Sequence, residues 1–239
     1  MASLYNTLEE KIPVWRDDAK SLLKNNGSSV ISEVTLTQAY GGMRGVKGLV
    51  CDTSSVYPDA GLIIRGKPLL EIIDILPEQV LFLLLADEMP DDDALSDLKS
   101  QLSEHATVPD YIWTILNSMP EDSHPMAMFN TAILAMEKES IFRKNYDKGL
   151  KKEDFWKPTL EDGLRLIAKL PAIGAGVYRI RFQKGGLIEP DESLDWGANF
   201  AHMLGLNDPG GNLKKLMRLY LMIHCDHEGG NASTFTSLT

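Results

Sequence analysis

Apolar residues recur at helical spacing over the first part of the chain, from residue 4 to residue 24. Positions three or four apart along an α-helix share one face, so the apolar members of this stretch form one side of a helix. An Asn-Asn-Gly sequence follows at residues 25–27 and is typical of a helix end. The pattern therefore predicts an amphipathic helix over residues 4–24, with an apolar face of Leu4, Leu8, Ile12, Trp15, Ala19, Leu22 and Leu23.

Shorter apolar runs between residues 30 and 64 favour strands. Residues 30–36 alternate weakly between apolar and polar positions, and residues 49–51 and 62–64 are short β-like runs. From Pro68 onward almost every segment has helical periodicity. The expected helices cover residues 79–86, 94–106, 109–118, 124–138, 160–182 and 194–204. The sequence predicts a mainly α protein with a small β element near the N-terminus, and no repeat or linker marks an internal boundary.

Charge and cysteine content narrow the class of protein. The chain has 239 residues, with 24 Lys and Arg against 34 Asp and Glu, a net charge of −10. Nucleic acids and anionic membranes are therefore poor partners. The longest apolar run, residues 80–86, is far shorter than the ~18 residues of a membrane span. The N-terminus has neither the pattern of a signal peptide nor that of a transit peptide, so we expect a cytoplasmic protein with Cys51 and Cys225 reduced.

Residues 224–233, near the C-terminus, concentrate the candidate chemistry. His224 and His227 would lie on one helical face if the preceding apolar helix continued through them, with Glu228 beside them. Gly229 and Gly230 would then break the helix, and Asn231 and Ser233 could cap a new helix whose N-terminus favours an anion. Acidic neighbours favour protonated imidazoles, which predicts a cationic site for a small acid.

Two other interpretations of the same residues are open. His, Cys, Asp and Glu are all metal ligands, but the order His-Cys-Asp-His-Glu does not fit the helical zinc signature His-Glu-x-x-His. The two histidines could instead be buried and satisfied by backbone carbonyl groups.

A second candidate segment is the glycine-rich run of residues 41–48. It contains four glycines with Arg44 and Lys47, but Lys47 is followed by glycine, so the phosphate-loop motif is not met. On its residues alone, this run would be a glycine-rich hairpin with solvated cations.

The string His224–Ser233 resembles the HSDHEGGNVS segment of eukaryotic-type citrate synthases. Further segments agree in the same order, and the resemblance covers nearly the whole chain; they are residues 40–50, 124–126, 166–171, 178–179, 194–196, 199–200, 203–205 and 217–223. Two positions depart from the family pattern: Asp87 stands where glycine is usual, and Gly197-Ala198 stand where Ser-His is common. The resemblance implies the citrate synthase fold and an acyltransferase of the tricarboxylic acid cycle.

The resemblance also implies roles for particular residues. His227 would contact oxaloacetate, supported by His224, Asn231 and Ser233. Arg44 would lie near the coenzyme A phosphates, where the planar guanidinium suits a phosphate group. Lys152 falls where an Arg of the neighbouring subunit reaches the coenzyme A phosphate, although a solvated pair of lysines at residues 151–152 is the alternative.

The parent reaction implied is the condensation of acetyl-CoA with oxaloacetate and water to citrate and coenzyme A, in a homodimer without metal or redox cofactor. The family uses an aspartate base and two histidines, and these catalytic positions would all lie beyond Thr239. We therefore expect residues 1–239 to be the N-terminal part of the large domain, without the small domain and inactive alone. A 2-methylcitrate synthase, a citryl-CoA lyase and a non-catalytic helical assembly protein on the same scaffold are the alternatives.

Overall fold

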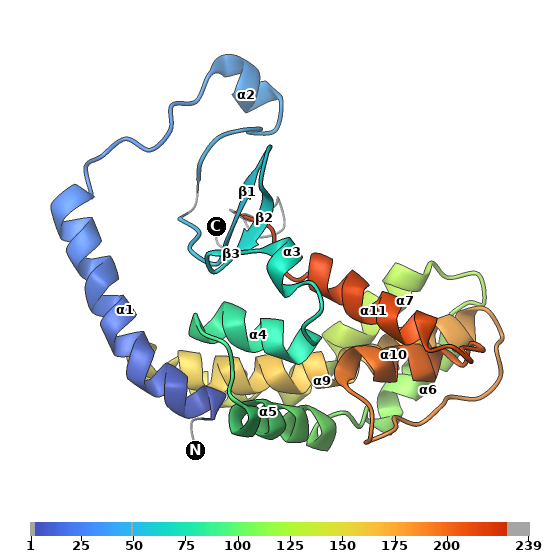
Figure 1. Cartoon of the computed structure of the whole chain (residues 1–239). Coiled ribbons are helices and arrows are strands. Elements are labelled where there is room, and N and C mark those ends of the chain that lie inside the picture. Colours follow the sequence, from blue (N-terminus) through green and yellow to red (C-terminus); the bar gives the residue numbers. More distant parts are fainter. Residues whose placement is uncertain (1–2, 49, 229–239) are drawn as a thin grey trace. The chain divides into compact units, whose positions relative to one another are not determined.

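The computed structural model describes residues 3–48 and 50–228 and shows a mostly helical chain (Figure 1). These residues form two compact units. Unit 1 comprises the described residues up to Ile75, Gln79–Ala94 and the described residues from Met222 on. Unit 2 comprises Leu76–Glu78 and Leu95–Leu221. The assignment of the chain to a large domain without the small domain stays a prediction. Within the described residues, no helix combines the length and apolarity needed to cross a membrane.

Unit 1 begins with helix α1, Leu4–Asn26, as the apolar spacing predicts. A short helix, α2, follows at Leu36–Tyr40, and no strand forms over residues 30–36, so that prediction is wrong. A capping box begins α2: the Gln38 N–H donates to Thr35 Oγ1 (3.2 Å), and the Thr35 N–H donates to Gln38 Oε1 (3.0 Å). The helix thus starts at Leu36, the last residue of the expected strand, and residues 30–35 have no regular structure.

A small antiparallel sheet follows in unit 1. Its strands are β1 (Ser54–Tyr57), β2 (Gly61–Ile64) and β3 (Lys67–Pro68), in the order β1-β2-β3, with Val56 opposite Leu62. The β-like run at residues 62–64 is thereby confirmed. In the run at 49–51, Leu49 lies outside the described residues, and Val50 and Cys51 are not in a strand.

The core of unit 1 joins the sheet to helices from distant parts of the sequence. Helices α3 (Leu69–Ile72) and α4 (Pro77–Ala86) follow the strands. The buried residues of this core are Ile64, Ile72, Val80, Leu83 and Met222. After α4, Asp87 has a φ of 58°, in the left-handed region, and its carboxylate lies 3.8 Å from Arg65 Nε. Aspartate tolerates this conformation better than most residues, which explains how it replaces the family's usual glycine.

Unit 2 is built of helices. The segments after α5 (Asp92–Glu104) are α6 (Asp110–Ser118), α7 (Pro125–Ala135), η1 (Met136–Glu139), α8 (Ile141–Tyr146), η2 (Lys152–Asp154), α9 (Trp156–Arg181), α10 (Trp196–Leu204) and α11 (Asn212–Ile223). The predicted helices are confirmed to within a few residues, except that 124–138 is divided between α7 and η1. Helix α8 was not predicted; its first N–H groups donate to Asp162 of α9, at 2.8 Å from Ile141 and 3.0 Å from Phe142.

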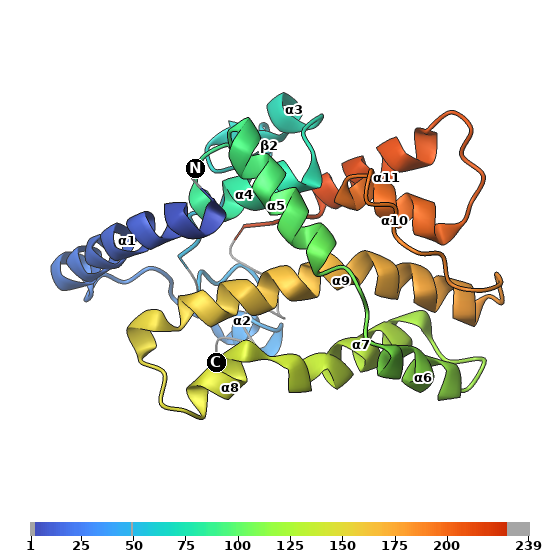
Figure 2. The same cartoon turned by 90° about the horizontal axis from the view of Figure 1, so that it is seen from below.

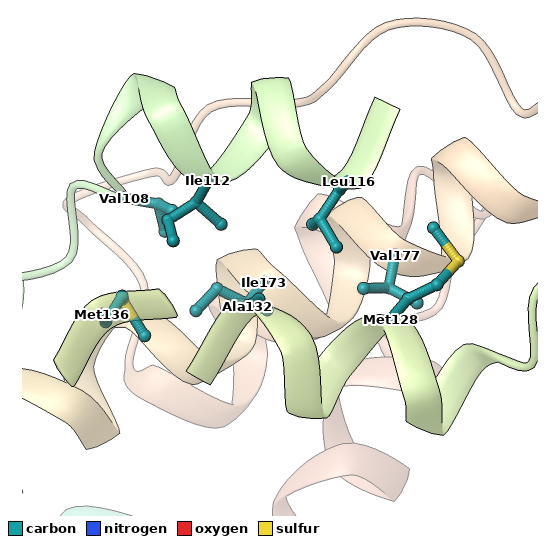
Figure 3. Close-up of a cluster of buried hydrophobic side chains, with 8 residues drawn as sticks. All are labelled: Val108, Ile112, Leu116, Met128, Ala132, Met136, Ile173 and Val177. Atoms are coloured by element: carbon teal, nitrogen blue, oxygen red, sulfur yellow. The ribbon is translucent and has the colours of Figure 1, made fainter. Parts of the chain in front are cut away.

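The core of unit 2 lies where α6, α7 and α9 pack together. Figure 2 shows α9 running beside α7, and Figure 3 shows the buried side chains of α6, α7 and α9 together with Val108, before α6, and Met136, the first residue of η1. They are Val108, Ile112, Leu116, Met128, Ala132, Met136, Ile173 and Val177. Gly176 on α9 leaves room for the Trp113 ring of α6, because an added Cβ there would lie 2.5 Å from that ring. The apolar spacing thus fixes α9 against both neighbours.

Candidate functional site

The two histidines of the candidate site lie after the end of α11, not on it. The helix ends at Ile223, His224 lies in a turn, and His227 lies in irregular chain, so the prediction of a shared helical face is wrong. The Cys225 N–H donates to the Met222 carbonyl at 3.4 Å, which closes a tighter turn. The His227 N–H donates to the Asp226 side chain, Oδ1, at 2.9 Å. An aspartate that takes a neighbouring N–H competes with the helix, and this accounts for the early end.

The segment that carries the histidines is anchored in the core of unit 1. Met222 is fully buried in that core, and the half-buried Cys225 packs against it. Burial, together with the nearby charge of Asp226, raises the pKa of the Cys225 thiol to about 11. The thiol is therefore protonated at neutral pH and serves as an apolar anchor rather than a nucleophile.

A second attachment lies at Glu228. Its Oε2 atom accepts the N–H of Val56, in strand β1, at 2.8 Å. This bond joins residues 172 positions apart in the sequence. Sequence reasoning missed it, because nothing in the local pattern around either residue indicates so distant a partner.

The predicted site residues are only partly described. His224 and His227 are both exposed, which contradicts the alternative of two buried histidines, and they flank the packed Cys225. Asn231 and Ser233 lie outside the described residues, as do the two glycines, so their predicted supporting roles stay predictions. Two exposed imidazoles on an anchored segment can meet a small anion from solution through hydrogen bonds and, when protonated, through charge.

The predicted coenzyme A residues lie in different units. Arg44 of unit 1 is exposed in a series of turns at residues 41–45, where its carbonyl oxygen accepts from Gln38 Nε2 at 3.2 Å. Residues 41–48 form no paired strands, so the alternative of a glycine-rich hairpin is wrong. Lys152, in unit 2, is the exposed first residue of η2. The roles of Arg44 and Lys152 at coenzyme A stay predictions.

Unit 2 contains a buried carboxyl group that no sequence motif indicated. Glu78 is 2% exposed; its Oε1 accepts the Trp196 N–H at 2.7 Å, while its buried Oε2 has no hydrogen-bond partner among the described residues. Burial raises the pKa of Glu78, and the nearby charge of Asp195 adds to the effect. A cavity of about 500 Å³ is lined in part by Glu78, Lys99 and Asp195.

Asp195, which lines the same cavity as Glu78, is a charged carboxylate. It accepts hydrogen bonds from Arg218 Nε (3.0 Å) and Nη2, and from the Ala198 N–H at 3.0 Å. Burial opposes ionisation of Asp195, but these bonds outweigh it and hold its pKa below the ordinary value. Gly197 permits the packing here, because an added Cβ would lie 3.1 Å from Arg218 Cγ. This contact gives a structural reason for glycine where the family commonly has serine.

Metal-ligand side chains are dispersed over the part of the chain that the structure describes: nowhere in it do three or more His, Cys, Asp or Glu side chains gather as a metal site would require. The prediction that the protein uses no metal or redox cofactor stays a prediction.

Comparison with known proteins gives a consistent result. The family model described as "Citrate synthase, C-terminal domain" matches residues 42–239. Citrate synthase 4, mitochondrial, of Arabidopsis thaliana is 40% identical over 98% of this chain, which covers 51% of that protein. The peroxisomal citrate synthase of Saccharomyces cerevisiae is 38% identical (99% and 54% covered), and the mitochondrial 2-methylcitrate synthase of Yarrowia lipolytica is 41% identical (95% and 51% covered). The chain spans about half the length of these relatives.

Solved structures show the same fold. The citrate synthase of Pyrobaculum aerophilum superposes with a TM-score of 0.74 at 22% identity, over 88% of this chain and 55% of that one. The citrate synthase of Thermoplasma acidophilum, solved as a ternary complex with carboxymethyl coenzyme A and oxaloacetate, gives a TM-score of 0.70 at 20% identity, over 87% and 51%. At these identities the likeness concerns the fold alone, and it confirms the predicted mainly α class.

Proposed function

The chain belongs to the citrate synthase family, and on that premise we propose that it is half of an enzyme that condenses acetyl-CoA with oxaloacetate and water to citrate and coenzyme A. The proposal is supported by about 40% identity to named citrate synthases over nearly all of these residues. It extends their activity to a chain that spans 51% of their length.

The observation that carries the proposal is the pair of exposed imidazoles on the anchored segment from Met222 to Glu228. Oxaloacetate is a dicarboxylate with a ketone, so it needs hydrogen-bond donors and positive charge at fixed positions. His227 is held between the packed Cys225 and the Glu228–Val56 bond, so its ring can offer a donor at a defined place. We assign His227 to a carboxylate or the ketone of oxaloacetate, and His224, Asn231 and Ser233 to its support.

The second substrate would be held by cations. We assign Arg44, and with it Lys152, to the phosphates of coenzyme A, which here is part of a substrate and not a bound cofactor. By the family resemblance, Lys152 would reach the phosphate from a partner subunit, so this assignment is part of the same proposal and requires a homodimer. The predicted cytoplasmic location is not supported by the relatives, whose names place them in mitochondria or peroxisomes.

The test uses nuclear magnetic resonance of the 239-residue chain. Millimolar oxaloacetate should shift the ring resonances of His227 in a saturable way, because a bound carboxylate changes the charge and hydrogen bonding at the ring. His105, which lies in unit 2, should not respond, and sodium sulfate of equal ionic strength controls for a general anion effect. In the His227→Ala variant, the other resonances that shift saturably with oxaloacetate in the wild type should no longer shift. If His227 does not respond to oxaloacetate, the proposed function of this site is wrong.

A second activity is favoured by one relative. The 2-methylcitrate synthase of Yarrowia lipolytica is as similar to this chain as the citrate synthases are, at 41% identity. It would use the same oxaloacetate contacts with propionyl-CoA as the thioester. Relative turnover of acetyl-CoA and propionyl-CoA, measured on the enzyme that contains this chain, separates the two activities.

A further inference from the structure

Glu228 occupies a position at the edge of the small sheet that gives it a defined structural task. In the described sheet β1 has β2 on one side only, so the N–H groups on its other side have no strand partner. Such edge donors are satisfied by water, a side chain or another strand. Glu228 Oε2 accepts one of them, the N–H of Val56, and a carboxylate acceptor makes this bond stronger than a neutral one.

The same hydrogen bond fixes the C-terminal end of the anchored segment, at Glu228. Met222 is fully buried and Cys225 packs against the same core, so the segment is fixed at its start. From Cys225 to Glu228 the described chain has no regular structure; its local bonds join Cys225 N–H to the Met222 carbonyl and His227 N–H to Asp226 Oδ1. Without the bond to Val56, the chain on the far side of His227 would therefore be held much less firmly.

We propose that Glu228 is a positioning residue: its carboxylate, bound to the β1 edge, sets the place of the neighbouring His227 ring for oxaloacetate. The inference rests on the proposed function of His227. The hydrogen bond between Glu228 and Val56, called the tether below, does not depend on that function. The inference assigns to Glu228 a role that depends on accepting the Val56 N–H, a hydrogen bond that the negative charge strengthens. A glutamine at this position keeps an acceptor oxygen of nearly the same reach, whereas alanine removes it.

Three variants of the 239-residue chain test the tether. In Glu228→Ala, amide hydrogen exchange at Val56 should accelerate about fivefold or more, as expected for the loss of one hydrogen bond. The His227 ring resonances should move in the same variant. Glu228→Gln keeps a neutral acceptor and should lie closer to the wild type than to Glu228→Ala in both measurements. Glu33→Ala, an exposed glutamate of the same unit, removes the same charge and should change neither. The methyl resonance of the buried Met222 confirms in each variant that the core is intact.

Oxaloacetate titration then links the tether to binding. We expect Glu228→Ala to bind oxaloacetate about tenfold more weakly, as expected when one charge-assisted bond no longer fixes the site. Glu228→Gln should restore affinity. Wild-type exchange and His227 resonances in Glu228→Ala, or unchanged oxaloacetate affinity, would overturn the inference. The inference would also be overturned if Glu228→Gln bound oxaloacetate as weakly as Glu228→Ala. The negative charge of Glu228, and not its hydrogen bond to Val56, would then determine the affinity. If the His227 ring resonances of the wild-type chain do not shift with oxaloacetate, the proposed function is wrong. This result is independent of what hydrogen exchange at Val56 shows about the tether.

Discussion

At the scale of single residues, Glu78 is a carboxyl side chain that the fold removes almost entirely from water. Its pKa is raised above the ordinary 4.5 by burial, with Asp195 adding to the effect and the Trp196 N–H opposing it. Between pH 4.5 and the raised value, the folded chain keeps a proton that the unfolded chain has released. Stability must therefore fall as pH rises through this window.

The Glu78→Gln variant tests this linkage. Glutamine cannot ionise and can still accept the Trp196 N–H, so its stability should lack this fall. We expect the free energy of unfolding of the variant, relative to that of the wild type, to improve between about pH 5 and about pH 8. Urea denaturation at both pH values measures it. Glu71→Gln, at an exposed position, is the control. A relative stability of Glu78→Gln that does not change with pH would contradict the assignment.

The candidate site shows what single residues in a sequence can and cannot predict. The composition of residues 224–233 indicated a candidate site, since imidazoles beside acidic groups and glycines suit an anion, and its binding role stays a prediction. The helical face was wrong because it depends on a competition: Asp226 takes the His227 N–H and ends the helix. The tether to Val56 could not be inferred, because it requires knowing that β1 passes Glu228.

At the scale of elements, the helices and strands also differ in how far local sequence could predict them. Helices α6 and α9 were predicted because apolar spacing and nearby prolines are local signals. The strand expected at 30–36 was wrong: residues 30–35 have no regular structure, and the Thr35–Gln38 capping box begins α2 at Leu36. Helix α8 was missed because Asp162, on another helix, satisfies its first N–H groups. Apolar spacing thus predicted the longer helices, whereas the short helices α2 and α8 were missed.

The N-terminus of α10 depends on Asp195, which caps the helix and pairs with Arg218 of α11. Asp195→Ala removes the cap and leaves Arg218 without this partner, so it should cost about 2–3 kcal/mol of unfolding free energy. Asp195→Asn keeps a capping oxygen and should cost about 1 kcal/mol less than alanine. Asp18→Ala, at an exposed helical position, should stay within about 0.5 kcal/mol of the wild type. Chemical denaturation measures all three, and equal losses for alanine and asparagine would contradict a capping role.

At the scale of the whole molecule, the chain pairs the family's fold with about half the length of its relatives. Both units have buried apolar cores, so each has the means to hold its own helices. Substrate binding and catalysis require different numbers of positioned groups in addition to a stable fold. A carboxylate can be met by a few positioned donors, whereas carbon–carbon bond formation needs a base and groups that stabilise the enol at the same time.

This difference leads to an expectation for the activity of the 239-residue chain. By family resemblance, the base and the enol-stabilising histidine belong to the half of the enzyme that these residues do not match. The purified chain should therefore bind oxaloacetate through His227 yet release no coenzyme A from acetyl-CoA above the rate without oxaloacetate. A thiol assay measures the release, with a full-length citrate synthase as the positive control. Oxaloacetate-dependent release at about one turnover per second or faster, a rate ordinary for enzymes, would contradict this expectation and place the missing catalytic groups within these residues.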